Sequence, residues 1–191
     1  MKKLILASAS PRRKQLLEMI GVSCKVVPSN IEEKLNPRLK PKSQAESLSL
    51  QKAEHVAQKY EDAFILAADT FISIHDEILG KPKDREDAKR MLRKLSGKTH
   101  SVFTGFSIID TKRGKAISRS CETKVSMKKL TQREIDEYVK KEDLLDKSGS
   151  YAIQGIAAIF IEKIEGDFFN IVGLPVYTVA QELKRFGIKV L

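Results

Sequence analysis

The sequence predicts an α/β fold built on a mixed, twisted sheet. Strand-like apolar runs alternate with amphipathic helical stretches along all 191 residues, which is typical of α/β proteins. No internal repeat or low-complexity linker interrupts this alternation, and the chain is long enough to bury a substantial core. We therefore expect a single domain over residues 1–191, with two lobes around one cleft.

The formal charge of +10 predicts an anionic partner. The lysines are spread along the whole chain, tryptophan is absent and aromatic residues make up only 6%, so a nucleic-acid surface is not expected. A nucleotide substrate explains the charge as well as a polymer does.

The targeting and cysteine signals are weak. The opening apolar run is too short for a signal peptide, and no stretch approaches the roughly 20 residues that cross a bilayer. We therefore expect a cytoplasmic protein without a membrane partner. Cys24 and Cys121 belong to no motif, so neither a zinc site nor a disulfide framework is indicated.

The first strand and helix predict a phosphate site. The strand Leu4–Ala7 enters Ser8-Ala9-Ser10-Pro11-Arg12-Arg13, in which Ser10 suits the N-cap and Pro11 the first helical position. Arg12 and Arg13 lie one turn before Leu16 and Leu17, so we expect both to project from the sheet-facing side. Helix dipole, hydroxyl groups and two guanidinium groups would then meet at one anion site.

The next helix carries a lysine on its apolar stripe. After a strand at Ser23–Val27 and a loop over residues 29–41, Ser43 and Glu46 form a capping box that predicts a helix to about Tyr60. Lys52 lies between Leu48 and Val56 at i+4 spacing. Such a lysine either extends to the surface or reaches into a cleft.

Acidic residues follow the second strand and interrupt the third. The strand Phe64–Ile74 is mostly apolar and carries Asp69, which either braces a loop or acts as a metal ligand or general base. Glu32 and Glu33 are an ordinary exposed pair unless they lie near Asp69, where they would complete a site for Mg²⁺ or Mn²⁺.

The remaining elements follow from caps, stripes and turns. The sequence predicts a helix closed by Gly97, a hairpin, a helix capped by Thr131 and Glu134, a strand and a final helix from Pro175. The first helix is expected at Asp84–Leu95, and the two strands of the hairpin at Ser101–Ile109 and Ala116–Met127. The capped helix is expected at residues 131–141, and the strand at Ala157–Ile164.

Two loops add candidate ligand contacts. Leu79-Gly80-Lys81-Pro82-Lys83 is a rigid basic turn, and Lys81 there would join the other cations around one polyphosphate. Tyr151-Ala152-Ile153-Gln154-Gly155 places an amide beside a glycine at a strand-like edge. Gln154 either reads a base through paired donor and acceptor groups or bonds to the backbone as a buried glutamine.

Six ordered motifs make the chain similar to a known family. They resemble the Maf-type nucleoside triphosphate pyrophosphatases, a family first associated with septum formation. Ser148 stands where alanine is commoner, a departure that we expect to leave the chemistry unaltered. The matching segments are residues 6–13, 67–70, 79–82, 95–105, 146–155 and 170–175.

The resemblance implies roles for the candidate residues. It makes Asp69 the proton acceptor, and Asp69 and Glu33 the ligands of a divalent metal, Mg²⁺ or Mn²⁺. Arginine, threonine and glutamine at the branch-determining positions resemble the dTTP/UTP branch. The implied substrate-binding residues are Ser8, Arg12, Arg13, Lys52, Thr70, Lys81 and Gln154.

The resemblance also implies a reaction and a fold. The expected reaction splits the α–β phosphoanhydride of dTTP and UTP to the monophosphate and pyrophosphate, with CTP and modified pyrimidine nucleotides as further candidates. The implied fold is elongated, two-lobed and similar to inosine triphosphate pyrophosphatases, with a deep cleft. It is often dimeric, which makes a homodimer one expected state.

Two alternatives of other classes stay open on the sequence. A non-catalytic nucleotide-binding regulator of cell division would bind nucleotide without metal-dependent turnover. A nucleic-acid binder would show steeply salt-dependent affinity for oligonucleotides and indifference to free dTTP.

Overall fold

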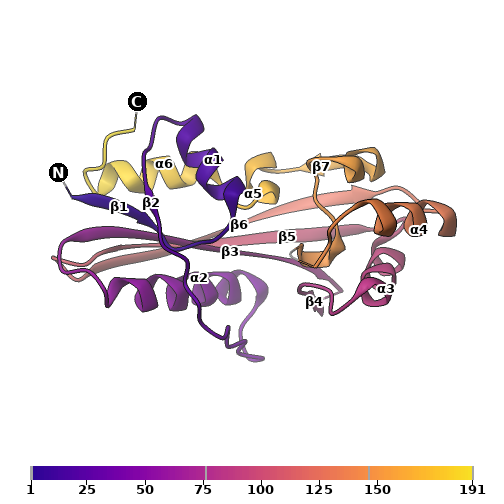
Figure 1. The fold of residues 1–191 in the computed structure, drawn as a ribbon, viewed down its shortest axis with the longest axis horizontal. Coiled ribbons are helices and arrows are strands. Elements are labelled where there is room, and N and C mark those ends of the chain that lie inside the picture. Colours follow the sequence, from indigo (N-terminus) through magenta and orange to yellow (C-terminus); the bar gives the residue numbers. More distant parts are fainter. Residues whose placement is uncertain (1, 76, 146, 191) are drawn as a thin grey trace. The chain divides into compact units, whose positions relative to one another are not determined.

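The computed structural model describes residues 2–75, 77–145 and 147–190, and it confirms an α/β fold with a mixed sheet (Figure 1). Seven strands form one sheet in the order β2-β1-β3-β5-β6-β7, with β4 paired to β3. β1 pairs in parallel with both β2 and β3, whereas β3–β4 and β6–β7 are antiparallel. The strands are β1 Lys3–Leu6, β2 Lys25–Val26, β3 Ala63–Ile74, β4 Glu77–Leu79, β5 Thr99–Asp110, β6 Lys115–Met127 and β7 Ile161–Glu165.

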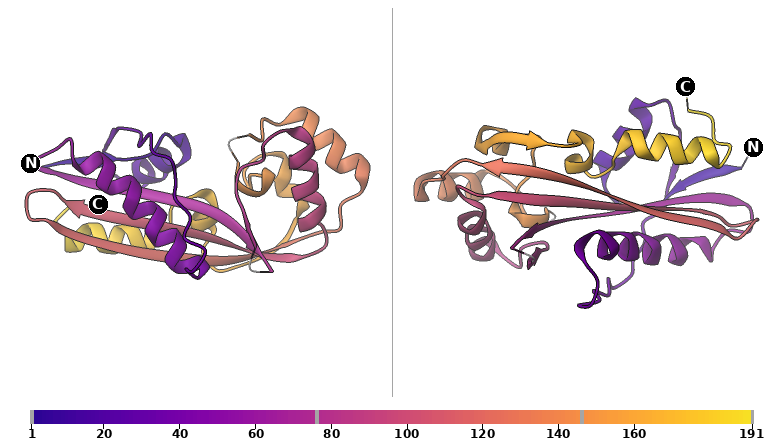
Figure 2. Two further views of the ribbon diagram at one scale, coloured as in Figure 1. Left: turned by 90° about the horizontal axis from the view of Figure 1, so that it is seen from below. Right: turned by 180° about the vertical axis from the view of Figure 1, so that it is seen from behind.

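Six α-helices and two 3₁₀ helices complete the described residues. In Figure 1 and in the right-hand view of Figure 2, α2 lies on one face of the sheet and α1 and α6 lie on the other. The helices are α1 Pro11–Met19, α2 Pro41–Ala57, α3 Arg85–Leu95, α4 Gln132–Lys141, η1 Ser148–Ser150, η2 Ile156–Phe160, α5 Phe168–Val172 and α6 Val176–Arg185.

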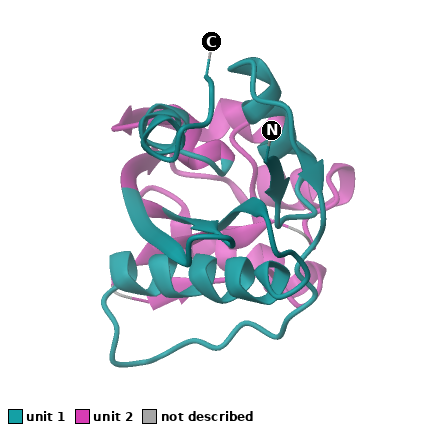
Figure 3. Ribbon diagram, turned by 90° about the vertical axis from the view of Figure 1, so that its left-hand side faces the viewer, with its two compact units in different colours: residues 1–69, 104–121, 173–191 teal, residues 70–103, 122–172 magenta. Residues whose placement is uncertain are grey.

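The chain divides into two compact units, coloured separately in Figure 3. The first unit comprises residues 1–69, 104–121 and 173–191, and the second comprises residues 70–103 and 122–172. Strands β3, β5 and β6 contribute residues to both units. The division between Asp69 and Thr70 therefore falls inside one strand, between two residues that the sequence analysis names as candidate site residues.

Each unit has a hydrophobic cluster of its own. In the first unit, β1 and β3 contribute Ile5 and Ile65, which pack with Ala53 and Val56 of α2. In the second unit, α3 and α4 pack against each other, and Leu92 and Tyr138 belong to the same cluster as Phe160. The site residues of each unit are thus supported by a separate core.

A glycine lets α2 lie close to the sheet. A Cβ atom at Gly105 of β5 would lie 2.0 Å from the Ala45 carbonyl oxygen of α2, so no other residue fits there without moving the helix. α2 begins at Pro41, with Lys40 at the N-cap, and ends at Ala57. The predicted capping box at Ser43 and Glu46 is therefore wrong, because Pro41 suits the first helical position and starts the helix earlier.

Other boundaries also differ from the predictions. The strand expected at Ser23–Val27 is confined to Lys25–Val26, and β4 and α5 were not predicted. The strand expected at Ala157–Ile164 is wrong in its first half, which forms η2 before β7 begins at Ile161. A short apolar run fits a buried helical turn as well as a strand, and Gly155 turns the chain with φ of 104°.

Candidate active site

The ends of two parallel strands bring the first site residues to one edge of the sheet. Leu6 of β1 pairs with Leu66 of β3, and the Ala7 amide donates to the Leu66 carbonyl oxygen at 2.8 Å. Ser8 and Asp69 lie just beyond this pairing, so both lie at the carboxyl edge, where open α/β sheets bind ligands.

The period of two along β3 turns Asp69 toward α2. Ile65, Ala67 and Asp69 share one face of the strand, and the first two pack with Ala53 and Val56 of α2. The Asp69 side chain is therefore directed toward the helix by the same alternation that builds the core. Only 7% of the residue is exposed, so its charge needs a partner.

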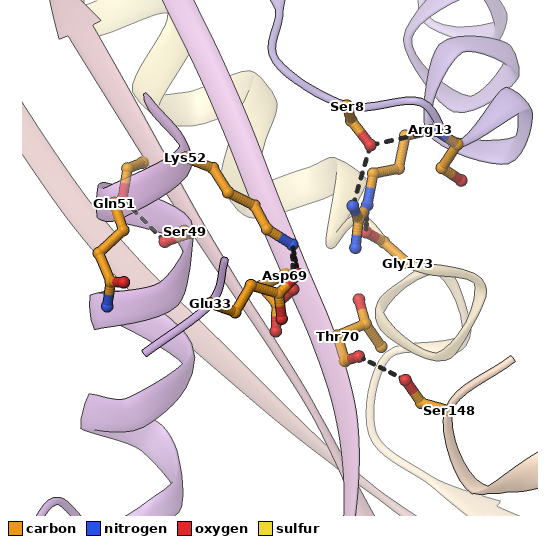
Figure 4. A network of polar contacts seen from close by, with 12 residues as sticks. Ser8, Arg13, Glu33, Ser49, Gln51, Lys52, Asp69, Thr70, Ser148 and Gly173 are labelled. Atoms are coloured by element: carbon orange, nitrogen blue, oxygen red, sulfur yellow. Dashed lines mark hydrogen bonds and ion pairs between the residues drawn. The ribbon is translucent and has the colours of Figure 1, made fainter. Parts of the chain in front are cut away.

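Lys52 of α2 provides that partner. Its Nζ atom contacts Asp69 Oδ1 and lies 2.8 Å from Glu33 Oε1 (Figure 4). The side chains of Lys52 and Asp69 are only 12% and 10% exposed, whereas that of Glu33 is 44% exposed. Of the two interpretations of Lys52, the surface one is therefore wrong, because the ammonium group joins two carboxylates.

A second polar cluster forms where β1 leads into α1. The Arg13 guanidinium donates from Nε to the Gly173 carbonyl oxygen at 2.8 Å and from Nη1 to Ser8 Oγ at 3.0 Å. Ser8 Oγ also accepts from the Ser10 amide at 3.2 Å. This arrangement is visible in Figure 4. Arg13 is thus locked in place by two separate parts of the chain.

Charges from both clusters act on the buried Arg13. Burial lowers the pKa of Arg13, and nearby Arg12 also lowers this pKa, whereas Asp69 and Glu33 raise it. The influence of Arg12, Asp69 and Glu33 shows that these charged groups lie within electrostatic range of Arg13. The two clusters of the first unit therefore influence each other electrostatically.

The predicted start of the helix is confirmed. Ser10 occupies the N-cap of α1 and Pro11 is its first residue, although the Ser10 side chain makes no capping hydrogen bond. Arg13 is buried and Arg12 is half-buried, so the two adjacent arginines differ in exposure.

The second unit holds the other predicted residues. Ser148 Oγ donates to the Thr70 carbonyl oxygen at 2.9 Å, and the Gly149 amide donates to the Gly80 carbonyl oxygen at 2.9 Å. These bonds join the chain at Thr70, the loop before Lys81 and the segment that leads to Gln154. The Lys81 and Gln154 residues are exposed.

Here too the structure corrects the sequence. Gln154 lies in a bend between η1 and η2 and not at a strand edge, and as an exposed residue it is not a buried backbone-bonded glutamine. Ser148, which the sequence interpretation treated as a neutral departure, makes a hydrogen bond to the Thr70 carbonyl oxygen. Its hydroxyl contact with Thr70 could not be found from composition or spacing. Asp146, which opens the same motif, lies outside the described residues.

The carboxylates fit a metal that is shared with a substrate. Among residues 2–75, 77–145 and 147–190, no group of three or more His, Cys, Asp or Glu could hold an ion alone. Glu33 and Asp69 both face Lys52, whereas Glu32 is exposed and has no part in this contact. Mg²⁺ commonly takes one or two carboxylates and completes its ligands with phosphate oxygens and water, so this pair suits it.

The comparison with known proteins agrees with the site. Residues 3–186 match the Maf family, described as Maf-like protein, and the chain belongs to this family. It is 46% identical over 190 residues to the dTTP/UTP pyrophosphatase of Bacillus cereus (strain ATCC 10987 / NRS 248), covering 100% of this chain and 93% of that protein. The dTTP/UTP pyrophosphatase of Bacillus anthracis (strain CDC 684 / NRRL 3495) is also 46% identical over 190 residues, covering 100% of this chain and 98% of that protein.

The predicted family is thereby confirmed, and the predicted enzyme class, nucleotide pyrophosphatase, is the one for which these relatives are named. Among solved structures, the Ham1 protein of Staphylococcus aureus matches with a TM-score of 0.48 at 13% identity, over 66% of this chain and 72% of that chain. The nucleoside-triphosphatase / dITP/XTP pyrophosphatase of Mycobacterium abscessus ATCC 19977 / DSM 44196 matches with a TM-score of 0.43 at 14% identity, over 67% of this chain and 75% of that chain.

Within the described part of the chain, no helix combines the length and the apolar character that crossing a membrane requires.

Proposed function

We propose that this protein is a nucleoside triphosphate pyrophosphatase that hydrolyses dTTP and UTP to the monophosphate and pyrophosphate. In this proposal the 191 residues act as a single domain. The names of the two Bacillus relatives support the substrate choice. CTP and modified pyrimidine nucleotides are further candidate substrates.

One observation carries the proposal most directly. Lys52 joins Asp69 and Glu33 in a largely buried position, and the buried Arg13 lies within electrostatic range of both carboxylates. Acidic and basic groups held together at the edge of a sheet suit a polyphosphate that arrives with a divalent cation. A purely structural ion pair would not need the second carboxylate or the second cation.

The chain's own residues would divide the chemistry. Asp69 orients the attacking water and accepts its proton. Lys52, Arg12 and Arg13 neutralise the charge that gathers on the pyrophosphate leaving group, Lys81 binds the polyphosphate, and the Ser8 hydroxyl orients a phosphate oxygen. Glu33 and Asp69 would hold Mg²⁺ or Mn²⁺, which would polarise the phosphate oxygens when bound.

The second unit would supply base recognition. The Gln154 amide offers paired donor and acceptor groups to a pyrimidine edge, and its exposure leaves those groups accessible. Thr70 follows Asp69 directly in β3, so base selection and catalysis would be adjacent along the chain. A homodimer and a cytoplasmic location remain predictions.

The test is pyrophosphate release from dTTP and UTP with Mg²⁺ or Mn²⁺, for the parent and for Asp69→Asn. We expect turnover by the parent, loss of turnover in EDTA, and a fall in kcat of about 10²–10⁴-fold in the variant. Asp69→Asn keeps the size of the side chain, so its melting temperature and its nucleotide binding serve as controls for the fold.

Equal rates for the parent and Asp69→Asn would remove Asp69 from the mechanism. Nucleotide binding without turnover in either protein would favour the non-catalytic regulator instead. Release of a single phosphate rather than pyrophosphate would mean that the β–γ bond is cleaved and not the proposed α–β phosphoanhydride.

A further inference from the structure

The segment that carries Gln154 lacks regular secondary structure. Residues 151–155 form neither helix nor strand, and Gln154 itself is exposed. Base recognition requires donor and acceptor groups at fixed positions, and an irregular exposed segment does not provide this by itself. The contacts that hold this segment therefore decide how well it can read a base.

The amino-terminal side of the segment is held by two backbone carbonyls. Thr70 accepts from Ser148 Oγ, and Gly80 accepts from the Gly149 amide. Gly149 has φ of 67°, and a Cβ atom there would lie 2.3 Å from Ile72 Cδ1. The segment is thus pressed against β3 where it begins.

A buried tyrosine hydroxyl holds the next residue. Tyr151 OH shares a hydrogen bond of 2.7 Å with His100 Nε2 of β5, and the two rings meet edge to face with centroids 5.5 Å apart. The chain is therefore fixed at Tyr151, three residues before Gln154.

The burial of His100 is unfavourable for the stability of the fold. It is 2% exposed, and its Nδ1 atom has no hydrogen-bond partner among the described residues. Burial lowers the pKa of His100 to about 4, so the imidazole is neutral near pH 7. A buried ring with one unsatisfied nitrogen is less favourable than an apolar ring of similar size, so packing alone does not explain a histidine here.

We propose that His100 and Tyr151 form a positioning pair that sets the base selectivity of the enzyme by fixing the chain that leads to Gln154. This inference rests on the proposed function, because it assigns the pair to the recognition of the nucleotide base. The pair belongs to the second unit, whereas Asp69, Lys52 and Arg13 belong to the first. It should therefore affect which base is accepted far more than how fast the phosphoanhydride is split.

The first experiment compares the parent with Tyr151→Phe, which removes only the hydroxyl group. The measured quantity is the ratio of kcat/KM for UTP to that for a purine nucleotide such as GTP. We expect this ratio to fall about threefold to tenfold, the scale of one neutral hydrogen bond, through a higher KM for UTP and a kcat within about twofold of the parent.

Two further variants separate positioning from general stability. Thr123→Val removes a buried hydroxyl of the same unit that bonds to Asp167 and Asn170, so it should lower the melting temperature without changing the ratio. His100→Phe should reduce the ratio as much as Tyr151→Phe, and the double variant should add nothing. His100→Gln retains an amide group for the Tyr151 hydroxyl and should restore most of the selectivity.

The outcomes distinguish this inference from the proposed function. An unchanged ratio in Tyr151→Phe, together with a lower melting temperature, would overturn the positioning role. If the parent prefers another base, the proposed substrate is wrong, and the ratio is then taken for the preferred base against the others. If the parent hydrolyses no nucleotide, amide hydrogen exchange tests the positioning role of the pair instead. Faster exchange over residues 152–155 in Tyr151→Phe but not in Thr123→Val would support that role. Unchanged exchange in Tyr151→Phe would refute it.

Discussion

The two compact units hold their candidate site residues in different ways. In the first unit, charged side chains contact one another: Lys52 joins Asp69 and Glu33, and Arg13 binds Ser8. In the second unit, Lys81 and Gln154 are exposed, and backbone carbonyls and buried hydroxyl groups hold the segments around them. One part of the site is fixed through its functional groups, and the other is fixed through its chain.

This difference indicates a division of labour. Groups that are buried and bonded to one another cost little to organise when charge develops, which suits the chemical step. Exposed groups on a braced segment remain free to meet different ligands, which suits recognition. Substitutions in the first unit should therefore reduce kcat and stability together, whereas substitutions in the second should change affinity or selectivity.

After Asp69→Asn, the largest effect should come from Arg13→Lys in the first unit. Arg13 donates from Nε to Gly173 and from Nη1 to Ser8, and a lysine ammonium cannot reproduce this planar pair of bonds. We expect kcat/KM for dTTP to fall about 10²-fold and the melting temperature to fall by roughly 5 °C. Steady-state kinetics and thermal unfolding measure the two effects.

Arg12→Lys is the matched control, because it makes the same change at the adjacent, half-buried position. Its melting temperature should stay within about 1 °C of the parent, since surface substitutions usually change stability by less than about 0.5 kcal/mol. If both variants lost activity without losing stability, Arg13 would be a phosphate ligand only and not part of a fixed, preformed cluster.

In the first unit, regular periods explain why two of the candidate residues, Asp69 and Lys52, meet. Alternation along β3 places Asp69 on the face of Ile65 and Ala67, and the stripe of α2 places Lys52 opposite. Where the chain carries clear caps, the helices also begin as expected: Thr131 and Glu134 form the predicted capping box of α4. Local rules suffice when a residue's neighbours are themselves in regular elements.

The contacts that brace the site could not be predicted in this way. Arg13 reaches the Gly173 carbonyl across 160 residues of sequence, and Ser148 reaches the Thr70 carbonyl across 78. Every residue has a backbone carbonyl, so an acceptor of this kind leaves no signal in the sequence. The bend at Gln154 was missed for a related reason, because the chain before it is held by Tyr151, whose hydroxyl bonds to His100 across 51 residues of sequence.

Lys81→Met in the second unit should have a smaller effect of a different kind. Lys81 is exposed, so removal of its charge should leave the melting temperature unchanged and raise KM for dTTP about tenfold with little change in kcat. Lys83→Met is the matched control in the same loop, and its KM should stay near that of the parent. Equal effects of the two variants would mean that the loop acts only through its total charge.

His100→Phe should have the smallest effect on the rate of hydrolysis and the clearest effect on the pH dependence of stability. His100 has a pKa of about 4 in the folded protein against 6.5 for the ordinary side chain. Above pH 6.5 the imidazole is neutral in both states, so it contributes no pH dependence there. As the pH falls below 6.5, the unfolded state takes up the proton first, and the folded protein loses relative stability until about pH 4.

We therefore expect the free energy of unfolding to decrease between pH 7 and pH 4.5 by about 2–3 kcal/mol more in the parent than in His100→Phe, which cannot take up this proton. Urea unfolding of the two proteins at both pH values measures the difference, and subtraction removes the carboxylates that they share. Parallel decreases would show that His100 is protonated in the folded state, which would place it in a more polar environment. They would also weaken the contrast between a charged first unit and a second unit held by neutral hydrogen bonds.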